Sequence, residues 1–497
     1  DGHFFYGVQF APSERFALMA EYNPTDYSIQ AGSNTYFKNN PPSSKFNFGL
    51  RWKPFSWSTI DLSWQRGDEP GIGVSFEFEL GRPFIPIYDH LYRELPEHAD
   101  DPPELRMARA LNESGFSDIG ATFRDDMLIV DLQNDSYFFT PRALGVAVEV
   151  LAPLVPDHVN RVDIIVKENG IPAVRLTTTR EDMVLYKTEQ ITAKQFLYLS
   201  EFDTANRYVP AGEKHDRTVV DLGIKPIVRF FINDPSGFFK YRAGIGAAAE
   251  IRPRPGSSFI AGISTYPVNT ISTSNIAPSQ AVRSDIVPYM EESVVLDRLM
   301  AQQIVKGPAE LYLKAAAGIL EAQYAGLDVE AGLPVFGGRL IVGGSGSVVK
   351  KREPGSLFSM HDNPSKDYYS TAFFDTRLNL PELDAWIDVK AGRFLAGDRG
   401  ARVTVSKFYN GLTLFAWYGM TGTSMFDDPY NRGYRDKGVG VSIPLRFFKG
   451  SDSRTTYSMA ISPWSRDVAQ DITRHTTLFD YIGRNIEIFL DKDSSFF

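Results

Sequence analysis

The chain has 497 residues, a formal net charge of −9 and no cysteine. The acidic balance gives no electrostatic basis for nucleic-acid binding, and the lack of cysteine excludes disulfides, thiolate metal sites and cysteine nucleophiles. No apolar run approaches the roughly 18 residues of a transmembrane helix, whereas aromatic residues make up 13% of the chain, which suits the aromatic girdles of a membrane-spanning β-barrel.

About five strands are predicted between residues 3 and 82. Every second residue in them is apolar, so each strand has one apolar and one polar face. The last of the five alternates its apolar residues with Gly73, Ser75, Glu77 and Glu79. A soluble β-sandwich is the alternative interpretation, but it predicts shorter strands and fewer aromatic residues on the outside. We therefore interpret residues 1–83 as a first set of barrel strands.

The periodicity becomes helical between residues 84 and 203. Leu105, Ala108 and Leu111 lie on one helical face, and Gly115 can end that helix. Strands are predicted at 119–124 and 127–132, before a second helix, and at 161–167 and 173–178, after it.

Capping residues place the later helices of this region. Thr140 is expected to be an N-cap, with Pro141 at the first helical position, and Thr179 with Asp182 predicts the cap of a short final helix. The order α-β-β-α-β-β describes a small α+β domain inserted in one barrel connection. Its helices and loops would lie badly in lipid, so we expect it to be aqueous and periplasmic.

Residues 204–497 are predicted to form a second set of about fourteen barrel strands. In residues 239–252, apolar side chains such as Phe239 and Tyr241 alternate with Lys240, Arg242 and later Gly, Glu and Arg residues. A final candidate strand spans residues 486–490. Because barrels of this kind have even strand numbers, the odd total suggests further strands before Asp1.

Residues 385–420 show the alternation most clearly. Ala385, Ile387, Val389 and Ala391 occupy one parity, and the pattern resumes on both sides of Asn410-Gly411, a hairpin signal. Strands of roughly ten residues joined by short turns are typical of outer-membrane barrels. The predicted fold is therefore an all-β, transmembrane, antiparallel β-barrel of the large outer-membrane type, with the inserted α+β periplasmic domain.

The polar parity of these strands predicts the side chains that face the barrel lumen. Sugars are held by hydrogen bonds from charged groups and by stacking on aromatic faces, so a lumen that mixes both suits a glycan. The alternative is that such residues only brace the wall through ion pairs. The glycan-contact candidates are Glu77, Glu79, Lys240, Arg242, Glu250, Arg252, Trp386, Asp388 and Lys390.

Catalytic and metal sites have little support in the sequence. No two of the seven histidines stand at metal-ligand spacing, and the glycine-rich run 343–347 lacks the Lys-Ser/Thr of a phosphate-binding loop. We expect no cofactor, no metal and no enzymatic activity. A glycan-modifying enzyme remains an alternative, for which Glu77 and Glu79 are the one acid pair to test.

Longer motifs resemble a known family. They are FNFGLRWKPFSWSTIDLSWQRG (46–67), the run that begins with VRSDIVPYMEE and ends with GLPVFGG (282–338), KAGRFLAGDRGARVTVSKFYNG (390–411) and DKGVGVSIPL (436–445). In this order they resemble the YjbH/GfcD family of outer-membrane proteins, which are encoded with exopolysaccharide and group 4 capsule systems. Members usually carry a further stretch before the equivalent of Asp1, and the tail after Arg466-Asp467 diverges from theirs.

The resemblance implies a barrel in the outer membrane of a Gram-negative cell, with a role in polysaccharide secretion or surface assembly. The expected partners are the polysaccharide, the lipid bilayer with its lipopolysaccharide, and periplasmic or lipoprotein components of the exopolysaccharide system, but no nucleic acid. The lumen would be a glycan conduit and the insert a docking domain. Alternatively, the lumen is closed and the barrel recruits partners.

Overall fold

The computed structural model describes residues 4–24, 43–77, 100–205, 212, 214–215, 217, 219–234, 236–278, 280–362, 366–409, 412–444, 456–462 and 466–497. The chain forms two compact units, Asp1–Ile87 with Arg446–Gly450, and Tyr88–Leu445 with Ser451–Phe497. Across these described ranges, none of the helices combines the length and the hydropathy needed to cross a membrane.

The first unit contains a five-stranded antiparallel sheet in the order β1-β2-β3-β4-β5. Its strands are β1 (Tyr6–Ser13), β2 (Phe16–Tyr22), β3 (Phe46–Phe55), β4 (Ser58–Gln65) and β5 (Glu69–Phe76). On the polar face, Arg51 and Asp61 are directly opposite each other and form an ion pair of 2.7 Å. The apolar face is exposed, as at Phe48 and Leu62. The alternation predicted for these strands is therefore present.

The second unit includes a six-stranded sheet in the order β10-β9-β8-β7-β6-β11. Strands β7 and β8 are parallel and joined through a helix, whereas the other pairs are antiparallel. The strands are β6 (Phe116–Arg124), β7 (Met127–Asn134), β8 (Arg161–Glu168), β9 (Ile171–Thr179), β10 (Glu201–Asp203) and β11 (Lys214–His215). The α-β-β-α-β-β order predicted from the periodicity is observed, and the sheet also takes in β11.

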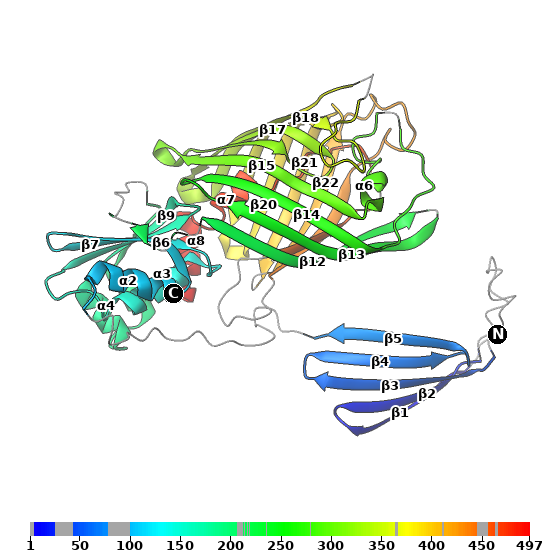
Figure 1. The fold of residues 1–497 in the computed structure, drawn as a ribbon, viewed down its shortest axis with the longest axis horizontal. Helices are drawn as coiled ribbons and strands as arrows, with labels where there is room; N and C mark the ends of the chain where they lie inside the picture. Colours follow the sequence, from blue (N-terminus) through cyan, green and yellow to red (C-terminus); the bar gives the residue numbers. More distant parts are fainter. Residues whose placement is uncertain are drawn as a thin grey trace. The chain divides into compact units, whose positions relative to one another are not determined.

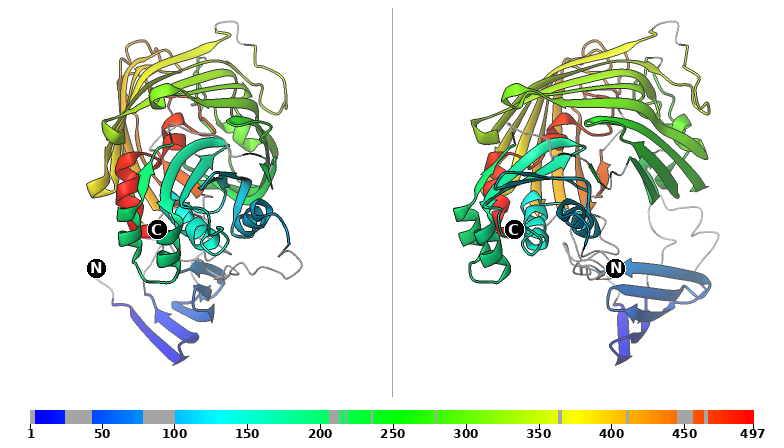
Figure 2. Two further views of the ribbon diagram at one scale, coloured as in Figure 1. Left: turned by 90° about the vertical axis from the view of Figure 1, so that its left-hand side faces the viewer. Right: turned by 60° about the vertical axis from the view of Figure 1, so that its left-hand side comes forward.

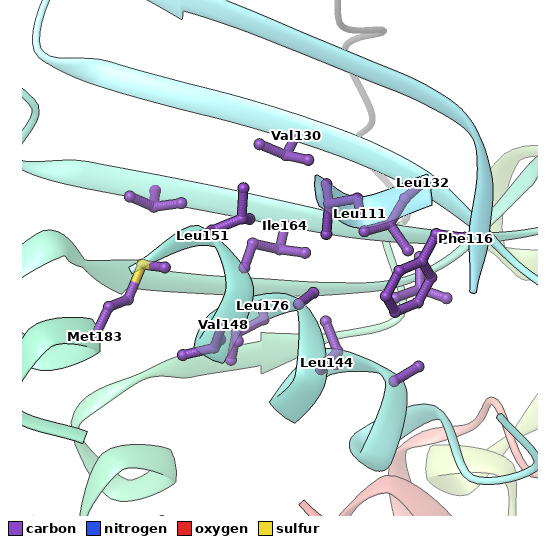
Figure 3. Packing of buried hydrophobic residues seen from close by; sticks show 14 of the residues in the cluster. Leu111, Phe116, Val130, Leu132, Leu144, Val148, Leu151, Ile164, Leu176 and Met183 are labelled. Carbon is purple, nitrogen blue, oxygen red and sulfur yellow. The ribbon is translucent and has the colours of Figure 1, made fainter. Parts of the chain in front are cut away.

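Helices cover one face of this sheet. They are α2 (Pro103–Glu113), α3 (Thr140–Leu151), α4 (Arg180–Lys187) and α5 (Ala193–Leu199). Figure 3 shows Leu144 and Val148 of α3 packed toward Ile164 and Leu176 of the sheet, all fully buried. The helices and the sheet of the insert thus share one hydrophobic core, to which Leu490 and Phe497 also contribute.

Two of the predicted helix caps have different outcomes. Thr179 caps α4, since its side chain accepts a hydrogen bond from the backbone N–H of Asp182, as predicted. The prediction for Thr140 was wrong: Phe139 is the N-cap residue and Thr140 begins the helix. The Thr140 hydroxyl instead donates to Asn485 Oδ1 at 2.5 Å, so a contact distant in the sequence takes its hydrogen bond.

A thirteen-stranded antiparallel sheet, β12 to β24 in sequence order, forms the larger part of this unit (Figure 1). Its first seven strands are β12 (Val220–Asp234), β13 (Gly237–Ile251), β14 (Ser257–Asn269), β15 (Val294–Lys306), β16 (Tyr312–Ile319), β17 (Tyr324–Val335) and β18 (Leu340–Lys351). The last six are β19 (Tyr369–Leu380), β20 (Ala385–Arg393), β21 (Arg399–Tyr409), β22 (Leu412–Thr421), β23 (Lys437–Pro444) and β24 (Thr456–Ile461). About fourteen strands were expected here.

Short helical turns lie in the connections of the sheet. They are α6 (Val287–Glu291), η3 (Pro308–Glu310), η4 (Phe336–Gly338) and η5 (Pro381–Leu383). The predicted hairpin turn Asn410-Gly411 lies outside the described residues, but β21 and β22 pair from Tyr409 and Leu412 onward.

The two faces of the thirteen-stranded sheet differ in polarity. In β17, the outward Leu327 and Val329 are 60% and 54% exposed, whereas the inward Asp328 and Glu330 are 2% and 8% exposed. The same arrangement recurs along β13, where Lys240 is buried and Phe239 is exposed. A water-soluble sheet would bury the apolar parity and expose the charged one.

The sheet curls so that its first and last strands meet. The Tyr457 hydroxyl of β24 donates to the Val228 carbonyl of β12 at 2.5 Å. Within the described residues, β12 and β24 share no backbone ladder, so the predicted closed barrel is not present there.

Residues 466–497, which we call the C-terminal segment, run from the inside of the curved sheet to the insert, where the last α-helix of the segment and the C-terminus lie beside α3 (Figure 1 and Figure 2, red). The segment contains α7 (Leu478–Ile482), α8 (Glu487–Asp493) and η6 (Ser494–Phe496). The prediction of a strand at 486–490 was therefore wrong. Ile486, Phe489 and Leu490 are each 2% exposed, at helical spacing, so one face of a helix buries all three.

The C-terminal segment contacts both the sheet and the insert. Leu478 and Ile482 pack with Ile304 of β15 and Ile341 of β18, while Phe497 lies in the core of the insert. The C-terminal segment therefore connects the thirteen-stranded sheet to the insert by apolar contacts.

Candidate functional site

The inner face of strands β17 to β22 and the C-terminal segment line a cleft of about 610 Å³, which we call the interior cleft. The cations that line it are Arg283, Arg377, Lys390, Arg402 and Arg474. The carboxylates that line it are Glu330, Asp375, Asp388, Asp471 and Asp480. The alternation of β17 to β21 brings the strand residues of these sets to one face, and tertiary packing adds the others.

Arg474 is the main link between the C-terminal segment and the wall. Its guanidinium is 2.9 Å from Asp328 Oδ1, 2.9 Å from Glu330 Oε1 and 2.7 Å from Asp471 Oδ2. The Arg474 side chain is only 3% exposed. Buried charges of this kind are stable when every partner is paired, so the segment is held firmly to the sheet.

A second link joins β19 and β20 to α7. Arg377 of β19 contacts Asp388 of β20 at 2.6 Å and Asp480 of α7 at 2.8 Å. The guanidinium also lies 5.5 Å from the ring of Trp386. One cation thus contacts two carboxylates and offsets part of their charge.

Lys390 forms the third link, because its ammonium group lies 2.6 Å from Asp471 Oδ2. Burial alone would raise the pKa of Asp471, but the charges of Lys390 and Arg474 hold that pKa well below its ordinary value. Asp471 is therefore ionised throughout the physiological pH range.

The VRSDI motif positions the start of the C-terminal segment. The backbone N–H groups of Val282, Arg283 and Ser284 donate to Asp467 Oδ1 at 2.9, 2.7 and 2.9 Å. Arg283 also pairs with Glu321 at 2.6 Å. Three consecutive N–H groups on one oxygen form an anion-binding nest, so this motif captures the carboxylate of Asp467.

The structure places three of the predicted glycan-contact residues at this site. Asp388 and Lys390 line the interior cleft, and Trp386 lies beside Arg377. All three come from β20, whose polar parity faces inward. The carboxylate of Asp388 pairs with Arg377 of the neighbouring strand, and the ammonium group of Lys390 pairs with Asp471 of the C-terminal segment.

Two further predicted residues, Lys240 and Arg242, are buried beneath the connection between β14 and β15. Lys240 Nζ donates to the Ser272 carbonyl at 2.7 Å, and Arg242 donates to the Met290 carbonyl at 3.0 Å. These contacts brace the wall at that end of the sheet.

The remaining predicted residues lie elsewhere. Glu250 and Arg252 pair at 2.9 Å, and Arg252 is 3.8 Å from Asp135 of the insert. Glu77 is exposed at the end of β5 in the first unit. Glu79 lies outside the described residues.

Sequence reasoning missed most of the interior cleft. Arg377 of β19 and Arg402 of β21 follow the polar parity of their strands, and extending the pattern to every strand would have found them. Asp471, Arg474 and Asp480 had no such signal, because they lie in a segment without strand periodicity.

The fold and the interior cleft define a class of protein: a mainly β protein whose curled sheet is apolar outside and charged inside. A family model described as "Exopolysaccharide biosynthesis protein YbjH" matches residues 1–484. The chain therefore belongs to the YjbH exopolysaccharide biosynthesis family.

Proteins similar to this chain include one relative and one solved structure. It is 23% identical to "Uncharacterized lipoprotein YjbH" of Escherichia coli (strain K12) over 509 aligned residues, which cover 96% of this chain and 70% of the relative. Among solved structures, OmpT (in-vitro folded), an outer membrane protein of Vibrio cholerae, matches 52% of this chain and 92% of its own, at 12% identity and a TM-score of 0.23.

Proposed function

We propose that this protein is an outer-membrane β-barrel protein that takes part in exopolysaccharide secretion or surface assembly. The observation that carries the proposal is the polarity of the thirteen-stranded sheet, which exposes apolar side chains outward and buries charges inward. A sheet face covered with exposed apolar side chains is unfavourable in water and favourable in contact with lipid. The exposed outward residues include Leu222, Ile224, Phe259, Leu313, Leu327 and Phe374.

The family and the relative support a location in the cell envelope. The family is described by exopolysaccharide biosynthesis, and the Escherichia coli relative is called a lipoprotein. The insert consists of helices packed on a sheet and joined by irregular loops. Irregular loops exposed to lipid would leave backbone polar groups without hydrogen bonds, so we place the insert in the periplasm as a docking domain for other components.

The C-terminal segment favours a closed interior over an open glycan conduit. It fills part of the space inside the curved sheet and is held there by the ion pairs of Arg474, Arg377 and Lys390. In single-channel recordings of the whole chain in planar bilayers, we expect no large steady conductance. A stable, wide pore in the same recordings would favour the conduit.

The proposed role needs no covalent chemistry and no cofactor. Its test is the amount of polysaccharide in the periplasm and outside the cell, in a strain that lacks this protein and in the same strain carrying it again. We expect periplasmic accumulation, or loss of surface polysaccharide, that the restored gene reverses. Unchanged polysaccharide in both compartments would contradict the proposal.

A further inference from the structure

Two aromatic side chains form a continuous surface on the inner wall beside the interior cleft. Phe415 and Trp417 of β22 are half-buried and stacked, with ring centroids 6.2 Å apart and planes 26° apart. Phe415 lines the cleft. We call this pair the aromatic shelf.

Glycines on the neighbouring strand make room for the aromatic shelf. Trp417 is paired with Gly438 of β23, and Phe415 with Gly440. A Cβ atom at either glycine would lie 2.2 Å from the ring that covers it. The rings therefore lie against the backbone of β23 at positions where a side chain would displace them.

Asp436 fixes the orientation of the shelf. It is 3% exposed, and its Oδ2 accepts a hydrogen bond from Trp417 Nε1 at 2.8 Å. The indole is thus held by a polar contact at its edge.

Arg402 of β21 lies next to the aromatic shelf, with its guanidinium carbon 4.8 Å from the centroid of the Trp417 ring. Among the described residues, Arg402 makes no hydrogen bond, and its nearest carboxylate, Asp436, is 3.8 Å away. Lys390 is directly opposite Arg402 on β20. Lys390 is paired with Asp471 at 2.6 Å, so Arg402 is the more loosely paired of these two cations.

The other cations of the interior cleft differ from Arg402 in their pairing. Each has a carboxylate oxygen within 2.7 Å; they are Arg283, Arg377, Lys390 and Arg474. Among the described residues, Arg402 is the cleft cation with the longest distance to a carboxylate, 3.8 Å to Asp436.

Resting on the proposed function, we infer that Arg402 and the aromatic shelf form a subsite for an acidic sugar residue of the exopolysaccharide. The apolar face of a sugar ring would stack on Phe415, the ring of the shelf that lines the cleft. The carboxylate of the sugar would pair with the Arg402 guanidinium, which lies over the Trp417 ring. A guanidinium suits this role because it binds carboxylates through two parallel N–H donors. The cleft volume of about 610 Å³ lies within the range typical of small-ligand sites.

A bracing role for Arg402 makes a different prediction. If the residue only supports Trp417 and Asp436, its replacement would lower stability without changing any preference between sugars. The sugar preference is therefore the measurement that separates the two roles.

The experiment uses the whole chain, purified in detergent, and isothermal titration with two probes of equal length, an oligogalacturonate and a neutral malto-oligosaccharide. We expect the wild type to prefer the oligogalacturonate, and Arg402→Gln to weaken that binding roughly tenfold or more while leaving the neutral probe unchanged. Arg402→Lys should retain part of the preference. Arg399→Gln, an exposed residue of the same strand, is the matched control and should bind as the wild type does.

Several outcomes would overturn the subsite. They are equal binding of the two probes by the wild type, no binding of the oligogalacturonate, or unchanged binding by Arg402→Gln. Should Arg402→Gln fail to fold, as judged by circular dichroism, the comparison rests on Arg402→Lys and on Phe415→Leu. Phe415 lines the cleft, so Phe415→Leu should weaken the binding of both probes. The polysaccharide distribution in cells separates the two proposals: normal export without the protein contradicts the proposed function, whereas a defect that Arg402→Gln fully repairs contradicts the subsite alone.

Discussion

Arg474 shows how single residues hold the C-terminal segment inside the sheet. It is paired with three carboxylates at once, Asp328, Glu330 and Asp471, and its side chain is 3% exposed. Without Arg474, these three buried carboxylates would keep, among the described residues, only Lys314 and Lys390 as cationic partners. Buried charge that loses a partner is costly. The same arrangement makes docking of the segment depend on pH.

We expect Arg474→Leu to weaken docking of the C-terminal segment by about 3 kcal/mol, the usual effect of breaking a buried pair. In the wild type, the depressed pKa of Asp471 stabilises docking above the ordinary carboxyl pKa of about 3.9, and this stability is lost as pH falls below that value. Without Arg474 the pKa of Asp471 rises, so release should begin at a higher pH.

Limited proteolysis of residues 466–497 across a pH series measures this release. Lys492→Leu is the control, since Lys492 is 41% exposed and lies 3.5 Å from Asp384. Equal cleavage of Arg474→Leu and the wild type at every pH would show that the ion pairs do not hold the segment.

At the scale of elements, the insert is organised around a buried lysine. Lys167 of β8 is 2% exposed and contacts Asp131 of β7 at 2.8 Å and Asp118 of β6 at 2.6 Å. Lys214 of β11 also pairs with Asp131. The cluster therefore joins four strands of the sheet by charge.

We expect Lys167→Met to destabilise the insert by about 3 kcal/mol, because Asp131, which is fully buried, loses its buried partner. Hydrogen exchange of peptides from β6, β7 and β8 in the whole chain measures the effect, with Lys194→Met on the exposed surface of α5 as control. Exchange rates that stay at the wild-type level would mean that Lys214 alone satisfies Asp131.

Sequence patterns predicted the existence of helices and strands better than the residues at which they begin and end. The helix ended by Gly115, which has φ +93°, and the cap at Thr179 were confirmed. The prediction that Thr140 is an N-cap was wrong because its hydroxyl donates a hydrogen bond to Asn485, which is 345 residues away in the sequence. Ile486–Leu490 was assigned to a strand because five residues are too few to distinguish the two-residue period of a strand from the 3.6-residue period of a helix.

At the scale of the whole molecule, the outward face of the thirteen-stranded sheet decides which solvent surrounds it. In water, replacing an exposed apolar residue with lysine is close to neutral. In a bilayer, the same change at the midplane costs roughly 2–4 kcal/mol. One substitution can therefore distinguish the two environments.

We expect Val329→Lys to impair folding into lipid vesicles, because Val329 is exposed on the outward face of β17. Leu383→Lys is the control, since Leu383 is 60% exposed in the η5 turn. The fraction of folded protein, read from the heat-dependent shift in gel mobility, is the measurement. Equal folding of both variants would argue that lipid does not cover this face.

The alternation of the strands could be predicted from the sequence, as could the side on which Lys240, Arg242, Asp388 and Lys390 lie, because a strand's side-chain period is a local property of the backbone. The contacts of those residues depend instead on how distant parts of the chain pack together. Asp471, Arg474 and Asp480 reach the cleft because a segment without strand periodicity folds back into the curve of the sheet. That placement depends on ion pairs between residues more than 80 positions apart in the chain, and no local pattern encodes such pairs.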